Sequence, residues 1–257
     1  MFKKLIFLAI LSAMLVCGAS DAALAGSVME KDVIVVGTEG TYPPYEYYDD
    51  SNNLTGFDVE LVKKVAEKIG KEVTIIDMAF DGLIPALLTG KIDAIAAALN
   101  ATAERRERVD FSDVYDIADA AILTKADNNT LKTLDDLRGK IVGVQLGTVE
   151  DNFLSNLDTQ FEVKRYQKTD DAVREVILNR NDCVLIGTLV ANSYIDSDRF
   201  EGALKIAFRQ EVNKPDEGFS FALRKNDSQF MDALNGALKE LGDSGDIKEL
   251  KKKYRMD

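Results

Sequence analysis

The amino-acid sequence predicts an α/β protein with two lobes. Short apolar strands alternate with helical stripes in the first half, and the same alternation begins again near residue 141. Such an alternation is typical of a mostly parallel sheet flanked by helices on both faces. A shorter tail follows, and we expect it to dock on a lobe because it is too small to enclose its own core.

Hydrophobic periodicity defines the elements of the first unit. Apolar residues between positions 57 and 69 recur at helical spacing, whereas 33–36 is a continuous apolar run typical of a buried strand. The expected elements are, in order, a strand at 33–36, a helix at 57–69, a strand at 73–76, a helix at 83–88 and a strand at 94–99.

The second unit and the tail follow the same rules. In the second unit we expect strands at 141–144, 161–166, 183–186 and 204–208, with helices at 148–157 and 170–178. In the tail we expect a strand at 219–223 and helices at 230–241 and 247–254. The helical stripes are assigned to the core and not to a function.

The N-terminus has the pattern of a secretory signal. Lys3 and Lys4 precede an apolar stretch at 5–16, and an A-x-A cleavage pattern ends at Ala25. We expect cleavage after Ala25 and a periplasmic or other extracytoplasmic location. Lipid anchoring at Cys17 is the weaker alternative, because Val16 precedes it where a small residue is expected. An uncleaved signal anchor is a third alternative, and no other segment is long and apolar enough to span a membrane.

Composition excludes several classes of function. The formal net charge of −12 disfavours nucleic acid and anionic membranes as partners. The chain has no histidine, so histidine triads and histidine metal sites are excluded. Cys183 is the one cysteine left after cleavage and lies in an apolar run, which predicts packing without a disulfide. We find no P-loop, G-x-G-x-x-G or C-x-x-C, and we expect no cofactor and no metal.

Residues 94–113 contain the pattern of a carboxylate site. An apolar run ends at Asn100, Thr102 can cap a helix, and Arg105 follows in the first turn. A strand end, free N–H groups at a helix N-terminus and a guanidinium together suit a small carboxylate. The alternative is an ordinary strand-to-helix turn with a solvated arginine face. That alternative is preferred for Arg106 and Arg108, and for Arg105 the pattern alone leaves both interpretations open.

Several longer motifs occur in a fixed order. They lie at 37–47, 56–61, 80–87, 90–93, 94–113 and 137–148, and together they cover nearly the whole mature chain. In these motifs the sequence resembles the family 3 extracellular solute-binding proteins, the receptors of amino-acid uptake transporters. The resemblance implies a periplasmic binding protein fold, in which two α/β lobes are joined by two hinge strands and close around a ligand.

The resemblance also implies the domain boundaries. Residues 1–25 are the signal peptide, 26–114 and 215–257 form a discontinuous lobe one, and 115–214 form lobe two with both hinge segments. The chain would enter lobe two near 115–119 and return near 211–215. The tail would then complete lobe one, in agreement with the expectation that it docks.

Matching positions imply roles for individual residues. Arg105 matches the arginine that clamps the ligand carboxylate, and Thr148 matches a residue of lobe two that binds the same group. Gly147-Thr148 also follows an expected strand and opens a helix, which independently suits an anion. The other matching ligand positions are the backbone of Ala98, Asn100, the aromatic walls Tyr42 and Phe80, and the side-chain contacts Glu39 and Gln145.

Each of these assignments has a simpler alternative. Thr148 is also a plausible helix cap, Asn100 a turn residue that ends a strand, Phe80 a core residue and Glu39 a solvated loop acid. A carboxylate at Glu39 would favour a cationic or amide-bearing ligand. Gln145 carries little weight in the assignment.

Position 187 departs from the family pattern. The family usually has an aspartate there, which pairs with the α-ammonium of the ligand, whereas this chain has Gly187. A buried ammonium without a carboxylate costs several kcal/mol. Either another acid replaces it, with Glu39, Asp216 and Glu217 as candidates, or the ligand lacks a standard α-amine.

The resemblance implies binding of a small carboxylate-bearing solute, with an amino acid expected, for delivery to a membrane ABC transporter permease. We expect a monomer that does not bind nucleic acid and is not an enzyme. One alternative is an enzyme on the same fold, similar to cyclohexadienyl dehydratase, with Glu39 as a general acid. Another is a ligand-sensing module that reports to a membrane receptor.

Overall fold

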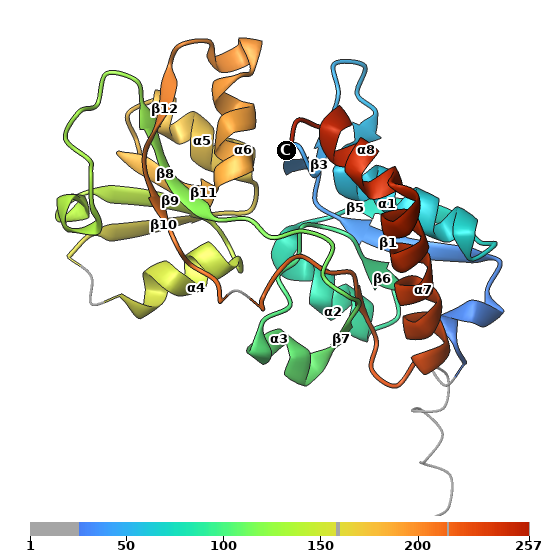
Figure 1. The fold of residues 1–257 in the computed structure, drawn as a ribbon. Helices are drawn as coiled ribbons and strands as arrows, with labels where there is room; N and C mark the ends of the chain where they lie inside the picture. Colours follow the sequence, from blue (N-terminus) through green and yellow to red (C-terminus); the bar gives the residue numbers. More distant parts are fainter. Residues whose placement is uncertain (1–25, 158–159, 215, 257) are drawn as a thin grey trace, which may run out of the picture.

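The computed structural model describes residues 26–157, 160–214 and 216–256. The expected signal peptide, its cleavage site and Cys17 lie outside the described residues. The described chain forms two lobes, each built on a five-stranded sheet with helices on both faces (Figure 1). The predicted fold class is thus confirmed.

The first sheet has the strand order β5-β1-β6-β13-β7. Its strands are β1 (Val33–Thr38), β5 (Glu72–Asp77), β6 (Ala94–Ile95), β7 (Asp110–Phe111) and β13 (Ala222–Leu223). Strand β1 lies parallel to β5 and to β6, and Val36 is opposite Ile75 on one side and Ala94 on the other. Strand β13 pairs antiparallel with both β6 and β7, so the C-terminal tail forms part of this sheet.

Alternate residues of these strands face helices on opposite sides of the sheet. Ile34 and Val36 pack in one core cluster with Leu61 and Phe230, whereas Ile95 packs in another cluster with Leu83. This alternation is the two-residue repeat of a strand buried on both faces. The helices of this lobe are α1 (Phe57–Lys68), α2 (Leu83–Leu88), α3 (Ala103–Arg108), α7 (Ser228–Ser244) and α8 (Asp246–Lys253).

A small antiparallel sheet lies beside the first lobe. It consists of β2 (Thr41–Tyr42), β3 (Glu46–Tyr48) and β4 (Leu54–Thr55). The sequence analysis did not predict these short strands, because two or three residues are too few to show a repeat.

The second sheet has the strand order β10-β9-β11-β8-β12. Its strands are β8 (Ala120–Lys125), β9 (Ile141–Gln145), β10 (Glu162–Tyr166), β11 (Cys183–Gly187) and β12 (Leu204–Gln210). Its helices are α4 (Val149–Asn156), α5 (Thr169–Ile177) and α6 (Thr188–Ile195). Val173 and Val190 pack on the face that carries Val184, whereas Leu154 packs with Cys183 on the other.

In each sheet one strand runs against the other four. Strand β8 pairs antiparallel with β11 and β12, as β13 does with β6 and β7. Both are the first strands that the chain forms after it has crossed between the sheets. Each sheet is therefore mostly parallel, as expected. The sequence analysis did not predict that β8 and β13 run antiparallel to their neighbours.

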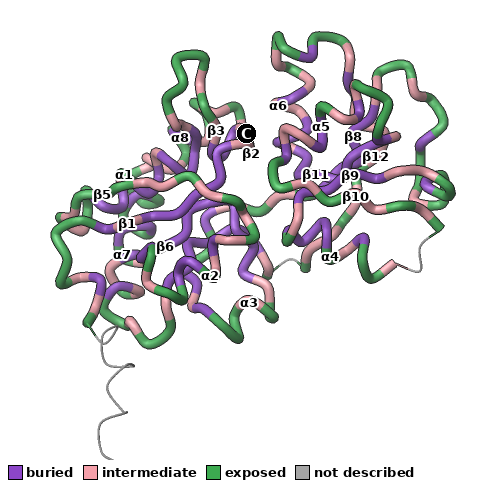
Figure 2. Tube along the Cα trace, turned by 180° about the vertical axis from the view of Figure 1, so that it is seen from behind, coloured by how far each residue is buried: buried purple, intermediate pink, exposed green. Residues whose placement is uncertain are grey.

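Two segments connect the sheets, one between β7 and β8 and the other between β12 and β13 (Figure 1). They run side by side, since the N–H of Phe219 donates to the carbonyl of Asp116 and the N–H of Tyr115 donates to the carbonyl of Phe219. Figure 2 shows the central strands of both lobes largely buried, whereas the edge strands β5 and β10 are only partly buried and the outer loops are exposed. The connecting segments thus form a paired hinge between the lobes.

Candidate ligand-binding site

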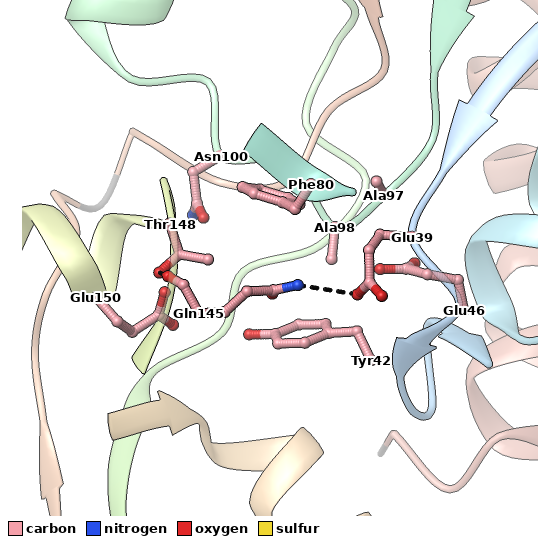
Figure 3. Close-up of a pocket in the computed structure, with 10 residues that line it drawn as sticks. All are labelled: Glu39, Tyr42, Glu46, Phe80, Ala97, Ala98, Asn100, Gln145, Thr148 and Glu150. Atoms are coloured by element: carbon pink, nitrogen blue, oxygen red, sulfur yellow. Dashed lines mark hydrogen bonds between the residues drawn. The ribbon is translucent and has the colours of Figure 1, made fainter. Parts of the chain in front are cut away.

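A cavity that is partly open to solvent lies between the two lobes, with about 280 Å³ of space not occupied by atoms (Figure 3). Its walls come from the carboxyl end of β1, strands β2 and β3, the segments after β5 and β6, and the junction of β9 with α4. The carboxyl ends of parallel strands are where α/β sheets bind ligands. The cavity is lined by Glu39, Tyr42, Glu46, Phe80, Ala97, Ala98, Asn100, Gln145, Thr148 and Glu150.

Figure 3 shows how these side chains are arranged. The rings of Phe80 and Tyr42 lie on opposite sides of the cavity. Thr148, Glu150 and Asn100 lie at one end, and Glu39 and Glu46 at the other. The arrangement suits an elongated molecule whose stem lies between aromatic rings and whose two ends differ in charge.

Two carboxylates are buried at the Glu39 end. Glu39 is 2% exposed and accepts hydrogen bonds from the Thr41 hydroxyl at 2.9 Å and from Nε2 of Gln145 at 3.0 Å. Burial raises the pKa of Glu39, despite the hydrogen bonds that favour its charged form. Burial and the neighbouring charges of Asp58 and Glu39 raise the pKa of Glu46 much further, and its Oε2 has no hydrogen-bond partner in the described chain.

Gln145 reaches across the cavity from the second lobe. Its Nε2 donates to Glu39, and its Oε1 accepts a 3.0 Å hydrogen bond from the Thr169 hydroxyl. Close by, the Tyr194 hydroxyl donates to the carbonyl of Thr41 at 2.9 Å. The two lobes are therefore held together around the cavity by direct hydrogen bonds.

Arg105 adjoins the cavity at its other end. Thr102 caps α3 by accepting a hydrogen bond from the N–H of Arg105, as the sequence predicted. The guanidinium donates to the carbonyl of Asn100 at 2.9 Å and to that of Gly147, on the second lobe, at 3.0 Å. It also lies 5.6 Å from the centre of the Phe80 ring. These contacts use two of its five N–H donors.

The environment of Arg105 disfavours its charged form. Burial is the main cause that lowers its pKa to about 10, and the charges of Glu150, Glu104 and Glu217 oppose this. Among the described residues no carboxylate forms an ion pair with it. An arginine placed in this way is suited to receive a carboxylate from a ligand.

The remaining predicted contacts, Ala98, Asn100 and Thr148, line the cavity. The Thr148 hydroxyl caps α4 at the N–H of Asp151 and donates to the carbonyl of Gln145, so capping and cavity lining occur together. The Asn100 amide donates to the carbonyl of Glu217. Ala98 donates its backbone N–H to Asp58 at 2.7 Å.

The predicted positions 187, 216 and 217 contribute no side chain to the cavity lining. A Cβ on Gly187 would lie 2.6 Å from the Tyr42 hydroxyl oxygen. The Glu217 carboxylate accepts from the N–H groups of Ala103 and Lys214, and Asp216 is exposed. Sequence reasoning missed Glu46 and Glu150, although Glu46 lies in a recognised motif and Glu150 in the first turn of α4.

A second cavity of about 220 Å³ continues from the first into the second lobe. It shares Tyr42, Gln145, Thr148 and Glu150 with the first cavity and extends beneath α5 to β11. Cys183 is buried, and burial raises the pKa of its thiol to about 12, which leaves the sulfur unreactive. The described residues contain no side-chain cluster that could hold a metal ion and no helix long and apolar enough to cross a membrane.

The model of the bacterial extracellular solute-binding proteins, family 3, matches residues 34–257. The chain belongs to this family. It is 37% identical over 245 residues to the arginine-binding extracellular protein ArtP of Bacillus subtilis, a match that covers 94% of this chain and 92% of ArtP. It is 36% identical to a probable histidine-binding protein of Campylobacter jejuni, with 86% of this chain and 84% of that protein covered.

Solved structures of the family have the same fold. The structure of an ancestral arginine-binding protein bound to arginine superposes with a TM-score of 0.82 at 36% identity. The match covers 87% of this chain and 98% of that one. The family resemblance inferred from the sequence motifs is thus confirmed.

Proposed function

We propose that this protein binds an α-amino acid with a positively charged side chain in the cavity between its lobes. The observation that carries the proposal is the pair of buried carboxylates, Glu39 and Glu46, at the end of the cavity opposite Asn100, whose carbonyl accepts a hydrogen bond from Arg105. An amino acid of this kind has a carboxylate for Arg105 and a cation for Glu39. Its apolar stem would lie between Phe80 and Tyr42.

The relatives support this choice of ligand. One is named as an arginine-binding protein and another as a probable histidine-binding protein. Both of these side chains can donate hydrogen bonds to a carboxylate. The Gln145 amide, which donates to Glu39 from the opposite lobe, occupies the position that we assign to the tip of the ligand side chain. On this proposal the Gln145 amide moves away from Glu39 when ligand binds, or both the amide and the ligand donate hydrogen bonds to Glu39.

The proposal includes the cellular setting. We propose that the chain is secreted, cleaved after Ala25, and acts as a monomer outside the cytoplasm. The domain division is 26–114 with 215–257 as one lobe and 115–214 as the other, with positions 158, 159, 215 and 257 outside the described residues. The loaded protein delivers its ligand to an ABC transporter permease without chemical change, in keeping with the relatives named above, which are binding proteins.

Calorimetry on the mature chain tests the ligand class. We expect L-arginine or L-lysine to bind at least about tenfold more tightly than L-glutamine or L-glutamate. Glu39→Gln should reduce this preference, because it removes the charge and keeps the hydrogen-bonding shape. Glu72→Gln, which removes the same charge from an exposed strand position, is the control. Preference for a neutral or acidic amino acid would overturn the proposal, and turnover of prephenate would favour the enzyme alternative.

A further inference from the structure

Glu150 is a buried acid at the end of the cavity opposite Glu39. It is 7% exposed and lies in the first turn of α4, and it lines both adjoining cavities. Figure 3 places it beside Thr148, at the same end of the cavity as Asn100. Its side chain is thus available to a molecule in the cavity.

Glu150 lacks the ion pair that its neighbour has. Asp151 is bonded to the Arg165 guanidinium at 2.8 Å, whereas in the described part of the chain no basic side chain forms an ion pair with Glu150. Burial raises the pKa of Glu150, and its own backbone N–H and the charge of Arg105 only partly oppose this. A buried carboxylate in this state is stabilised by any cation brought within hydrogen-bond reach.

Arg105 and Glu150 form a complementary set of charges. Arg105 belongs to the first lobe and Glu150 to the second, and neither is neutralised by an ion pair within the described chain. The α-carboxylate of a zwitterionic amino acid carries the charge opposite to that of Arg105, and its α-ammonium carries the charge opposite to that of Glu150. A head group between the lobes would therefore supply a partner to each at once.

The other candidate acids are less suitable for an ammonium at this end. Position 187 has no side chain, and the Tyr42 hydroxyl occupies the space where one would start. The Glu217 carboxylate is bound to backbone N–H groups outside the cavity. Glu39 lies at the far end of the cavity and already accepts from Thr41 and Gln145.

We propose that the Glu150 carboxylate binds the α-ammonium of the amino acid, while Arg105 binds its α-carboxylate. This assignment rests on the proposed function, since it takes the ligand to be an amino acid. It makes Glu150 the residue that distinguishes an amino acid from the same carboxylic acid without its amine. The acid is supplied by the start of α4 and not by the end of β11.

Paired ligands test this assignment. Each pair differs in the α-amine alone: L-arginine and 5-guanidinopentanoate, L-lysine and 6-aminohexanoate, L-leucine and 4-methylpentanoate. Affinities are measured by calorimetry for the wild-type mature chain, for Glu150→Gln and for Glu150→Asp. Glu104→Gln is the matched control, because it removes an exposed charge that also acts on Arg105. Thermal unfolding without ligand checks that each variant folds.

We expect the wild type to bind each amino acid that it accepts about tenfold to a hundredfold more tightly than the matching acid without the amine. Glu150→Gln should remove most of this difference, Glu150→Asp should retain part of it, and Glu104→Gln should retain it in full. An unchanged difference in Glu150→Gln, or equal losses for both members of a pair, would overturn the role of Glu150.

The same measurements separate this assignment from the proposed ligand class. Comparison between pairs tests whether a cationic side chain is preferred, and comparison within a pair tests the α-amine. If L-leucine binds best and Glu150→Gln still abolishes its advantage over 4-methylpentanoate, Glu150 retains its role and the cationic ligand class is wrong. If no amino acid binds, both proposals fail.

Discussion

The backbone N–H of Ala98 donates a 2.7 Å hydrogen bond to the Asp58 carboxylate. Ala98 lines the cavity with φ of +43°, in the left-handed region that alanine rarely adopts. Asp58 lies in the first turn of α1 and is fully buried, and the same oxygen accepts from the hydroxyl of Tyr115 in the first connecting segment. One carboxyl group thus fixes the cavity wall and ties it to the hinge.

Replacing Asp58 should therefore destabilise the protein. Asp58→Ala leaves the Ala98 N–H and the Tyr115 hydroxyl buried without an acceptor, at a cost of about 1–3 kcal/mol for each group. Asp58→Asn keeps an acceptor oxygen and should cost less. Urea unfolding of the two variants measures the difference, and equal stabilities would contradict this role for the acceptor.

The pH dependence of stability should reveal the same group. Burial raises the pKa of Asp58 from 3.8 to about 7, so the folded state holds the proton more tightly than the unfolded state does. The tighter binding of this proton stabilises the folded state. The stabilisation is fully present below the pKa of Asp58 in the unfolded chain and is lost as the pH rises through about 7. Each unit of pKa difference corresponds to about 1.4 kcal/mol.

Comparison with Asp58→Asn isolates this contribution from those of other acids. We expect the free energy of unfolding of the Asn variant, relative to wild type, to increase as the pH rises from about 4 to 7, because only the wild type must then bury a charge. Urea unfolding over this range provides the measurement. A difference that stays constant with pH would exclude a raised pKa for Asp58.

Arg105 should account for a large part of the affinity for the ligand. Arg105→Ala should weaken L-arginine binding by roughly 2–5 kcal/mol, since the ligand carboxylate would be left in the cavity without its partner. The affinity of Arg105→Lys for L-arginine should fall between those of the wild type and Arg105→Ala, because lysine keeps a positive charge but cannot bind a carboxylate bidentately. Arg108→Ala, on an exposed turn of the same helix, is the control. Calorimetry that gives wild-type affinity for Arg105→Ala would refute the assignment.

Much of the fold could be predicted from the sequence, because long elements repeat their pattern. The stripe at 57–69 and the run at 183–186 became α1 and β11 with small shifts at their ends. The strand expected at 94–99 is shorter and ends at Ile95, since Ala98 is held in a conformation that a strand cannot contain. That conformation depends on Asp58, which is distant in the sequence, so no local pattern could reveal it.

The candidate site was predictable to a different extent. Family motifs pointed to Tyr42, Phe80 and Thr148, which now line the same cavity as Glu39. Strand β8 and helix α6 were missed, although both are largely apolar and each is followed by turn-forming residues, at 127–129 and 196–198. The role of position 187 could not be read from the sequence at all. It depends on where the ring of Tyr42 lies, and that ring comes from the other lobe.

Tyr42 and Gly187 should be energetically coupled. A Cβ at position 187 would lie 2.6 Å from the Tyr42 hydroxyl oxygen and 3.4 Å from the ring carbon that carries it. Gly187→Asp should therefore weaken lobe closure and L-arginine binding, and should cost about 1–3 kcal/mol of stability through overpacking. Tyr42→Phe removes the hydroxyl oxygen nearest to that Cβ. In the Gly187→Asp background it should therefore reduce stability and affinity less than it does in the wild type.

A double-mutant cycle tests this coupling. Binding of L-arginine and urea unfolding are measured for the wild type, both single variants and the double variant, and we expect a coupling energy of about 0.5–3 kcal/mol. Gly236→Asp is the control, at an exposed glycine of α7 whose Cβ would meet no atom within 4 Å. Like Gly187, whose φ is −52°, it lies outside the left-handed region, so this variant adds the same side chain without the clash. Strictly additive effects would show that the hydroxyl of Tyr42 does not limit what position 187 can hold.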